Sequence, residues 1–457
     1  MDLEQKNRAL LTDLYELTMS AAYHRQDMNS PAAFEMFIRS PECRSYMVTA
    51  GLEQVLSYLE NLEFTDEQID YLRSVPVFDD VDEEFWNYLE DFSFTGSIRA
   101  VPEGTIVFGG EPLVSVRAPL IEAQVIETFM LSMINFQTLV ASKAARVVDA
   151  ACHDGTDRGV VDFGSRRAHG PDAAVLAARA SYLSGCLGTS NVEAGYQLGL
   201  PVFGTQAHSF VMAFDAEEEA FRTYYDTFPE SCVLLIDTYD VPKGAEKAAQ
   251  VAPGMRGVRI DSGDVVELSR KVRDILDSHG LHDARIIASG NLDEYRIRKL
   301  IEEGAACDAF GVGTALVTSQ DEPALSGVYK LTAIRQNGRW KPKIKLSEDK
   351  ATYPGFKQVH RVSDAESDMF HHDVLCTEDE DPPADSEPLL EWFMRGGQVI
   401  RDLPPLDDIR GRCRAQLQRL PHKYRKLKEA ERYPVQVSDR LQKRQEDIAR
   451  DIKERDV

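Results

Sequence analysis

The feature that most constrains the fold is an alternation of short apolar runs and helical patterns that begins near residue 158. The runs lie at 160–163, 202–204, 233–236, 258–260, 285–288 and 309–312, and helical periodicity is visible at 172–183, 243–251, 264–278 and 293–303. Repeated strand–helix units of this length predict a parallel sheet that is buried on both faces. Six units suit a closed or partly closed α/β barrel better than a small open sheet, although the pattern permits both.

The regions on either side of this repeat differ from it. The first ~135 residues indicate mixed α and β structure. Apolar spacing predicts a helix over 13–25, with Asp13 and Glu16 as a capping box, and 99–118 is typical of short strands and turns. After about residue 330 regular order weakens. The acidic stretch 376–388 predicts a loop or mobile excursion, and the charged stretch 406–457 predicts solvated helices.

Composition and charge exclude several classes of function. The chain has 457 residues, enough for two or three domains, and a formal net charge of −24. That charge disfavours nucleic acid and anionic membrane as partners, although local arginines can still form an anion pocket. We expect neither a signal peptide nor a membrane span. The seven scattered cysteines, never spaced as C-x-x-C, favour reduced thiols in the cytoplasm over a disulfide framework or a zinc site.

A cluster of small, polar or charged residues follows each apolar run. The clusters are GSRRAHG, TQAHS, DTYD, DSGD, SGNLDE and GTALVT. Because the carboxyl ends of parallel strands form the rim where α/β folds bind ligands, the clusters together predict a site. Any one of them is explained at least as well by helix caps and turns, but six in succession favour a function.

Two motifs in these clusters carry charge. Arg259 and Asp261 are two positions apart, so on a strand they face the same side, where the guanidinium can bind an anion and the carboxylate a metal or sugar hydroxyl. A structural ion pair is the alternative. His208 follows a strand-ending glycine and is suited to proton transfer or phosphoryl acceptance, although an ordinary packing histidine is the more common case.

Other residues of the clusters suggest phosphate binding. Gly311, Gly313 and Thr314 have the composition of a phosphate cradle, for which a tight turn is the alternative. The adjacent Arg166 and Arg167 cannot share one strand face, so we expect one of them to contact a ligand, and the pattern leaves open which.

Taken together, the motifs resemble the nicotinate phosphoribosyltransferases over nearly the whole chain. The shared motifs are TDLYELTM, FGSRRAHGPDA, GTSN, GTQAHSF, DTYD, VRIDSGD, SGNLDE, FGVGTALVT, GVYKL and PGFKQVHR. The resemblance implies an irregular α/β barrel (136–328) and a second mixed α/β domain built from both chain termini (1–135 and 329–457). It also implies a homodimer with shared active sites. The implied reaction converts nicotinate and 5-phosphoribosyl 1-pyrophosphate to nicotinate mononucleotide and pyrophosphate, with Mg²⁺ and coupled ATP hydrolysis.

The resemblance further implies roles for single residues. His208 matches the histidine that is phosphorylated in the family, and we expect it to act with Asp261 and Arg259. The residues expected at the nicotinate are Tyr15 (from the partner subunit), Phe163, Thr205, Arg259 and Ser190. Those expected at the phosphoribosyl and phosphate groups are Arg166, Gly311, Gly313, Thr314 and Asp13. Mg²⁺ is expected on the pyrophosphate near Asp261, and no protein zinc site is expected.

Three alternative functions remain. Nicotinamide-using relatives carry an aspartate where this chain has Ser190, and such an acid would accept from an amide but repel a carboxylate, so Ser190 favours nicotinate over nicotinamide. A sugar-phosphate barrel enzyme such as a Schiff-base aldolase would need a lysine at a strand end, which none of the six runs has. A non-catalytic sensor of the same pathway is disfavoured by the retained His208, Arg259 and Asp261.

Overall fold

The computed structural model describes residues 7–346 and 352–455. The chain divides into two compact units, of which the first comprises Met1–Leu139 and Ala324–Val457 and the second comprises Val140–Pro323. Helix α6 (Glu127–Ala151) begins in the first unit and ends in the second. The second unit is therefore one continuous segment inserted into the first.

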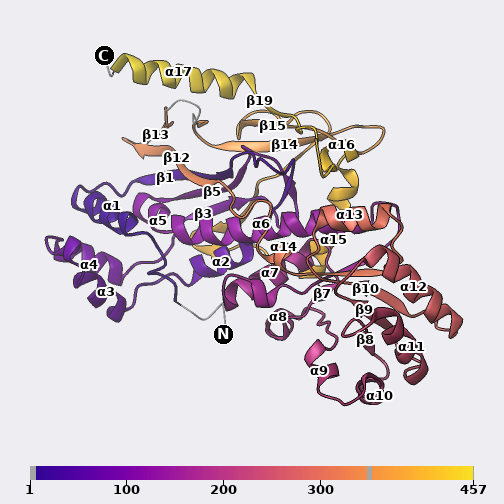
Figure 1. The fold of residues 1–457 in the computed structure, drawn as a ribbon. Coiled ribbons are helices and arrows are strands. Elements are labelled where there is room, and N and C mark those ends of the chain that lie inside the picture. Colours follow the sequence, from indigo (N-terminus) through magenta and orange to yellow (C-terminus); the bar gives the residue numbers. More distant parts are fainter. Residues whose placement is uncertain (1–6, 347–351, 456–457) are drawn as a thin grey trace. The chain divides into compact units, whose positions relative to one another are not determined.

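The second unit is built on a parallel sheet with the strand order β7-β6-β11-β10-β9-β8. The strands are β6 (Gly159–Asp162), β7 (Gly188–Thr189), β8 (Val233–Leu235), β9 (Gly257–Ile260), β10 (Arg285–Ala288) and β11 (Ala309–Val312). The helices are α7 (Pro171–Leu183), α8 (Val192–Leu198), α9 (His208–Met212), α10 (Glu217–Thr227), α11 (Val241–Val251), α12 (Val265–Ser278), α13 (Glu294–Glu302) and α14 (Thr314–Val317). Figure 1 shows α11 and α12 on one side of β8, β9 and β10. This confirms the predicted α/β class with a curled, incompletely closed barrel sheet.

One predicted strand of the barrel is wrong. Residues 202–204 do not form a strand; Val202 makes a single parallel bridge to Thr189. The sheet contains instead a strand that the apolar pattern did not reveal, β7, which pairs with β6 and receives the bridge from Val202. Only glycine fits at position 188, because a Cβ there would lie 2.2 Å from the Pro201 carbonyl oxygen. A two-residue strand of Gly and Thr carries no apolar run, so the pattern had nothing to detect.

The first unit contains a seven-stranded sheet with the order β13-β12-β1-β5-β3-β17-β18. Its strands are β1 (Pro31–Ile38), β3 (Ser97–Ala100), β5 (Pro112–Pro119), β12 (Gly327–Gln336), β13 (Arg339–Pro342), β17 (Glu391–Arg395) and β18 (Gln398–Val399). A four-stranded sheet contains β14 (Lys357–Ser363), β15 (Phe370–Thr377), β16 (Ser386–Pro388) and β19 (Val435–Val437), and β2 (Met47–Val48) pairs with β4 (Ile106–Val107). The strands within 99–118 confirm the prediction for that stretch, but the expected loss of order after residue 330 is wrong.

The helices of the first unit surround these sheets. They are α1 (Leu14–Arg25), α2 (Leu52–Glu60), α3 (Asp66–Arg73), α4 (Glu83–Glu90), α5 (Leu120–Val125), α15 (Leu406–Arg419), α16 (His422–Arg425) and α17 (Asp439–Arg455). The predicted helix over 13–25 is confirmed, but its capping box is wrong. Asp13 makes no capping hydrogen bond and instead accepts from the Thr128 hydroxyl (3.1 Å), while the buried Glu16 accepts from the Gln124 amide.

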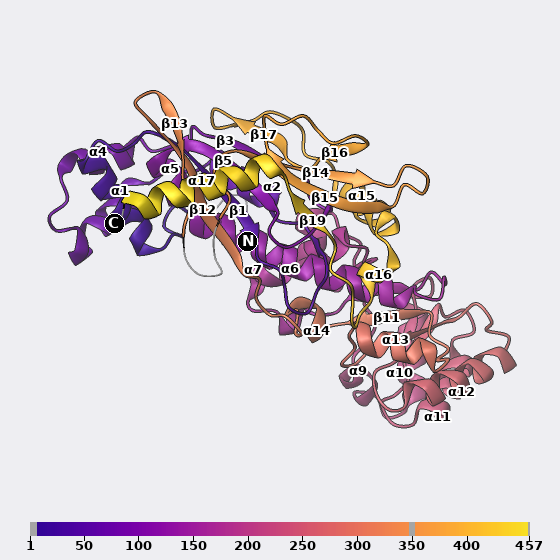
Figure 2. The ribbon, with the colours of Figure 1, turned by 90° about the horizontal axis from the view of Figure 1, so that it is seen from above.

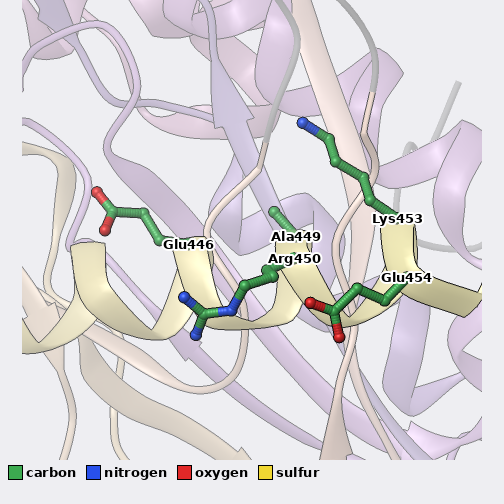
Figure 3. Close-up of a pocket in the computed structure, with 5 residues that line it drawn as sticks. All are labelled: Glu446, Ala449, Arg450, Lys453 and Glu454. Carbon is green, nitrogen blue, oxygen red and sulfur yellow. The ribbon is translucent and has the colours of Figure 1, made fainter.

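The charged C-terminal stretch is helical and largely solvated, as predicted, apart from the strand β19. Helix α17 has a shallow hollow beside it that Figure 3 shows in close-up, lined by Glu446, Ala449, Arg450, Lys453 and Glu454. Figure 2 shows this helix, in yellow, along the outside of its unit. Its charges pair with one another along the helix, since Arg450 donates to Asp447. These side chains are a solvated helix face and belong to none of the motif clusters.

One stretch of the described residues is long and apolar enough to cross a membrane. It runs over Leu120–Ala151, through α5 and α6, and 61% of its most apolar window is buried inside the protein. Burial of this kind is typical of a core helix in a folded protein, and length and composition are weak evidence for a membrane span.

Candidate active site

Phe163 lies directly after β6, at the carboxyl end of the parallel sheet. Its N–H donates to the Val312 carbonyl (2.8 Å), which extends the β6–β11 ladder by one residue. The ring packs over Gly311, where a Cβ would lie 2.3 Å from the nearest ring atom. Glycine at this position thus makes room for an aromatic ring, a use that the sequence did not suggest.

The turn that carries Phe163 is held by the buried Asp162, the last residue of β6. One carboxylate oxygen accepts from the Gly164 N–H (2.8 Å) and the other from the Thr189 hydroxyl (2.7 Å). Burial raises the pKa of Asp162, while these two hydrogen bonds lower it. The Asp162 carbonyl accepts from the N–H of Ser190 (2.8 Å), so Ser190 lies beside the same turn.

Arg259 extends from β9 toward this turn. Its guanidinium carbon is 5.9 Å from the centroid of the Phe163 ring, and Nη2 donates to the Gln206 carbonyl (3.1 Å). Burial lowers the pKa of Arg259, the carboxylates of Asp261 and Asp237 raise it, and the charge of Arg166 lowers it. An arginine stays protonated under such shifts, so the site holds a fixed positive charge. Of the two adjacent arginines, Arg166 is the one whose charge acts on Arg259.

His208 is the first residue of α9, and its side chain is 42% exposed. The ring Nδ1 is 3.2 Å from the Thr238 hydroxyl, and Nε2 is 4.0 Å from Oδ1 of Asp237. The Asp237 side chain is only 1% exposed and Oδ1 has no hydrogen-bond partner in the described structure. A buried carboxylate beside an accessible imidazole can orient the ring and stabilise a positive charge on it.

Asp237 and Asp261 are linked through the loop that follows β9. The second oxygen of Asp237, Oδ2, accepts from the N–H of Asp261 (3.1 Å) and from the hydroxyl of Ser262 (2.7 Å). Oδ1 of Asp261 accepts in turn from the hydroxyl of the buried Ser289 (2.5 Å). Gly290 allows this close packing, because a Cβ there would lie 2.0 Å from the Asp261 carbonyl oxygen. The two carboxylates are therefore fixed by donors from neighbouring strands.

The loop after β11 leads into a short helix. Gly313 precedes α14 in a conformation (φ −114°, ψ −102°) far from both the helical and the extended regions, and Thr314 is exposed at the helix start. Across the β6–β11 pair, the hydroxyl of Ser165 is buried without a hydrogen-bond partner in the described structure. Backbone N–H groups and a hydroxyl at a helix start suit an anionic ligand.

The segment between the Val202 bridge and α9 holds Thr205 and Gln206. The Thr205 hydroxyl donates to the Gln206 carbonyl (3.3 Å), the same oxygen that Arg259 contacts. The Gln206 side chain is 7% exposed, and neither of its polar atoms has a hydrogen-bond partner in the described structure. The second unit thus brings together His208, Arg259, Asp261, Phe163, Thr205, Ser190, Arg166, Gly311, Gly313 and Thr314.

Tyr15 and Asp13 lie in the first unit. Tyr15 is in the first turn of α1 with 50% of its surface exposed, and Asp13 is the exposed residue before that helix. Neither shares a unit with the other expected site residues.

Sequence reasoning assigned no role to Asp237, Ser262, Ser289 or Gln206. Each lies in a cluster that the sequence had singled out: DTYD, DSGD, SGNLDE or TQAHS. The signal was therefore present, but a motif does not state which of its members meet in space. Only the sheet order, which places β8, β9 and β10 next to one another, makes Asp237 the neighbour of Asp261.

In the part of the chain that the structure describes, no group of three or more His, Cys, Asp or Glu side chains could hold a metal ion. Five of the seven cysteines are buried.

The fold and this cluster define an α/β-barrel enzyme whose site, at the carboxyl edge of the sheet, takes an anionic ligand. Family models match three segments: the nicotinate phosphoribosyltransferase N-terminal domain at residues 10–135, the nicotinate phosphoribosyltransferase family at 159–361, and its C-terminal domain at 383–445. The chain is 46% identical to nicotinate phosphoribosyltransferase pncB2 of Mycobacterium tuberculosis over 450 residues, covering 96% of this chain and 94% of the relative. It is 38% identical to the nicotinate phosphoribosyltransferase of Bacillus subtilis, covering 94% and 93%.

A solved structure supports the same assignment. The crystal structure of human nicotinic acid phosphoribosyltransferase matches with a TM-score of 0.84 at 29% identity, covering 96% of this chain and 99% of the human one. The chain belongs to the nicotinate phosphoribosyltransferase family.

Proposed function

We propose that this protein transfers a phosphoribosyl group from 5-phosphoribosyl 1-pyrophosphate to nicotinate, forming nicotinate mononucleotide and pyrophosphate in NAD biosynthesis, with ATP hydrolysis coupled through His208. The observation that carries the proposal is the convergence of a fixed cation, two carboxylates, an aromatic ring and an accessible imidazole on one edge of the sheet, in a chain of this family. Each of these groups matches one demand of the reaction.

The pyridine acid is held by Phe163 and Arg259. The ring of Phe163 provides a flat apolar face for the electron-poor pyridine, and the guanidinium near it pairs with the carboxylate. Thr205 and Ser190 flank the same turn and supply hydroxyl donors. Arg259 has donors only, so it favours the carboxylate of nicotinate and offers no acceptor to the N–H₂ group of nicotinamide.

The phosphoribosyl group is bound by Gly313 and Thr314, at the start of α14, together with Arg166, and Gly311 serves the site from within β11 by making room for Phe163. Transfer from the ribose C1 develops positive charge on the sugar, which the carboxylate of Asp261 stabilises. A bound Mg²⁺ would supply the positive charge that offsets the charge of the leaving pyrophosphate. The donor set fits this ion, because Asp261 and Asp237 offer the oxygen ligands that it prefers and the lack of a larger acidic cluster in the described residues suits a cation carried by its phosphate ligand.

ATP enters the mechanism through the imidazole of His208. One ring nitrogen bonds to the γ-phosphorus while the bond to the β,γ-bridging oxygen breaks, and ADP leaves with that oxygen. Water later attacks the phosphorus, the P–N bond breaks, and inorganic phosphate is released. The buried Asp237 supports this role, because a carboxylate 4.0 Å from Nε2 steadies the ring while its other nitrogen acts.

The functional unit is a homodimer in which Tyr15 and Asp13 serve the partner's site. Large apolar side chains are exposed on α8 and α9 of the second unit, among them Tyr196 (87%), Val192 (73%) and Met212 (64%), and Tyr15 and Leu14 are half-exposed on α1. Exposed apolar groups of this kind mark interaction surfaces. The scattered spacing of the seven cysteines, typical of reduced thiols, supports a cytoplasmic location. Sedimentation of the purified protein at the mass of a monomer would contradict the dimer.

The decisive experiment measures mononucleotide formation with nicotinate and with nicotinamide, each with and without ATP. We expect turnover with nicotinate, stimulation by ATP, and little product from nicotinamide. Incubation with γ-phosphate-labelled ATP should label the protein with the acid lability and base stability of a phosphoimidazole, and His208→Ala should abolish both labelling and stimulation while the protein stays folded. No product from nicotinate in any condition would refute the proposed reaction.

A further inference from the structure

The carboxylate of Asp237 is shared between two parts of the site. On one side, its Oδ1 is 4.0 Å from Nε2 of His208 and has no hydrogen-bond partner in the described structure. On the other side, Oδ2 accepts from the N–H of Asp261 (3.1 Å) and the hydroxyl of Ser262 (2.7 Å). A single side chain therefore lies between the imidazole and the loop that carries Asp261.

A change of charge on the imidazole must act on this carboxylate. A phosphoryl group adds roughly −1.5 to −2 charges. The Asp237 side chain is 1% exposed, so water screens that charge poorly. Whichever ring nitrogen accepts the group, the force on Oδ1 changes, either by repulsion or by a stronger pairing with the remaining N–H. Oδ1 has no other hydrogen bond to hold it, so a movement of the carboxylate is transmitted through Oδ2.

The receiving end is the start of the loop after β9. The Ser262 hydroxyl and the Asp261 N–H are the two donors to Oδ2, and the Asp261 side chain is separately fixed by Ser289 (2.5 Å). Of the two donors to Oδ2, the Ser262 hydroxyl is the one that a side-chain substitution removes without altering either carboxylate. A hydrogen bond to a charged group is strong enough to change a binding constant about tenfold or more.

We infer that Ser262 is a positioning residue that couples the phosphorylation state of His208, through Asp237, to the affinity of the Asp261 loop for the phosphoribosyl substrate. The inference rests on the proposed function and adds to it the physical link between ATP hydrolysis and substrate binding. Ser262 does not touch the reacting atoms in this account. Its hydroxyl holds the Asp261 loop against the carboxylate of Asp237, which faces the imidazole of His208.

The test compares three substitutions in the full-length protein: Ser262→Ala, Ser262→Thr and Ser289→Ala. The measurements are the KM for 5-phosphoribosyl 1-pyrophosphate with and without ATP, the ATP consumed per mononucleotide formed, and labelling of His208 by γ-phosphate-labelled ATP. Ser289→Ala is the matched control, because it also removes a serine hydroxyl near Asp261. That hydroxyl donates directly to the Asp261 carboxylate and does not contact Asp237. Thermal unfolding of each variant establishes that it is folded.

We expect Ser262→Ala to keep its labelling by ATP and its KM in the absence of ATP. The ratio of the KM without ATP to the KM with ATP should fall about tenfold, and more ATP should be consumed per mononucleotide formed. Ser262→Thr, which keeps a hydroxyl, should restore much of the coupling, and Ser289→Ala should shift KM equally in both conditions. If Ser262→Ala changes KM equally with and without ATP, or not at all, Ser262 is an ordinary structural contact and the inference is wrong. If the wild-type protein itself shows no ATP effect, the proposed ATP coupling fails first, and the wild-type measurement alone reveals this.

Discussion

Adding one methyl group at Gly311 should disable nicotinate binding, because the ring of Phe163 occupies the space that the methyl needs. A Cβ at 311 would lie 2.3 and 2.4 Å from two ring carbons. Carbon atoms in contact are normally about 3.5–4.0 Å apart, so the ring must retreat by roughly 1 Å or more. Such overpacking typically costs about 1–3 kcal/mol. If the ring moves away from its stacking position, this free-energy cost appears mainly as weaker binding of the pyridine ring.

The expected result of Gly311→Ala is a rise of about 5- to 100-fold in the KM for nicotinate, at roughly 1.4 kcal/mol for each factor of ten. The KM for 5-phosphoribosyl 1-pyrophosphate should change less. The matched control is Gly204→Ala, which adds the same methyl in the neighbouring motif where nothing lies within 4 Å. Steady-state kinetics with each substrate varied, together with thermal unfolding, makes the test. A folded Gly311→Ala protein with an unchanged KM for nicotinate would refute the placement of the pyridine on Phe163.

Three further changes test the first unit. Arg361→Met should lower the free energy of unfolding by about 3–5 kcal/mol in urea titrations, because it leaves the fully buried Asp373, 2.6 Å from the guanidinium, without its cation. Thr65→Ala should cost about 1 kcal/mol by the same measurement, because Thr65 and Gln68 form a complete capping box. Burial, followed by the charge of Glu16, raises the pKa of Glu127 from 4.5 to about 7. Between these pH values the folded protein binds a proton that the unfolded chain releases, so stability should fall as the pH rises, and Glu127→Gln should recover about 1–2 kcal/mol at pH 8; equal unfolding curves for both proteins at pH 8 would contradict this.

The barrel could be predicted because its strands are buried on both faces and therefore leave continuous apolar runs. Five of the six predicted runs overlap strands of the parallel sheet, β6, β8, β9, β10 and β11. Strand β7, which was not predicted, lacks such an apolar run. Strand β7 consists of Gly188 and Thr189 and is specified by its neighbours, through hydrogen bonds to Asp162 and Pro201, rather than by its own composition.

The C-terminal half of the first unit was harder to predict because its strands are half-exposed or polar. Strand β12 mixes buried with partly exposed positions without a regular period, and β13 is mostly exposed, so neither has a continuous apolar run. One signal was nevertheless available. Asn337 and Gly338 join the two strands with φ of 51° and 75°. Asn-Gly between two candidate strands is the strongest short-range indication of a hairpin.

The helix at the N-terminus shows why a local motif can mislead. Asp13 and Glu16 have the spacing of a capping box, but both side chains contact residues more than a hundred positions away in sequence, Thr128 and Gln124. A partner at that distance competes with the local hydrogen bond, and no window along the sequence contains it. The true capping box at Thr65 and Gln68 is exposed, and the only other hydrogen bond of the Gln68 side chain among the described residues, from its amide nitrogen to Asn7 (3.4 Å), leaves the Gln68 oxygen free to accept from the Thr65 N–H.

The location of the candidate site could be predicted from the sequence, but the hydrogen-bond network within it could not. The unpaired polar atoms explain this difference. Among the described residues of the candidate site, the buried polar groups without a hydrogen-bond partner include the hydroxyl of Ser165, the amide of Gln206, Oδ1 of Asp237 and Nε of Arg259. A protein interior rarely leaves such groups unpaired, since each costs about 1–3 kcal/mol. Motifs identified which loops contain them, because the residue types are unusual after apolar strands. The partners themselves are supplied by strand order and by whatever ligand completes the site, and neither is written in the spacing of the residues.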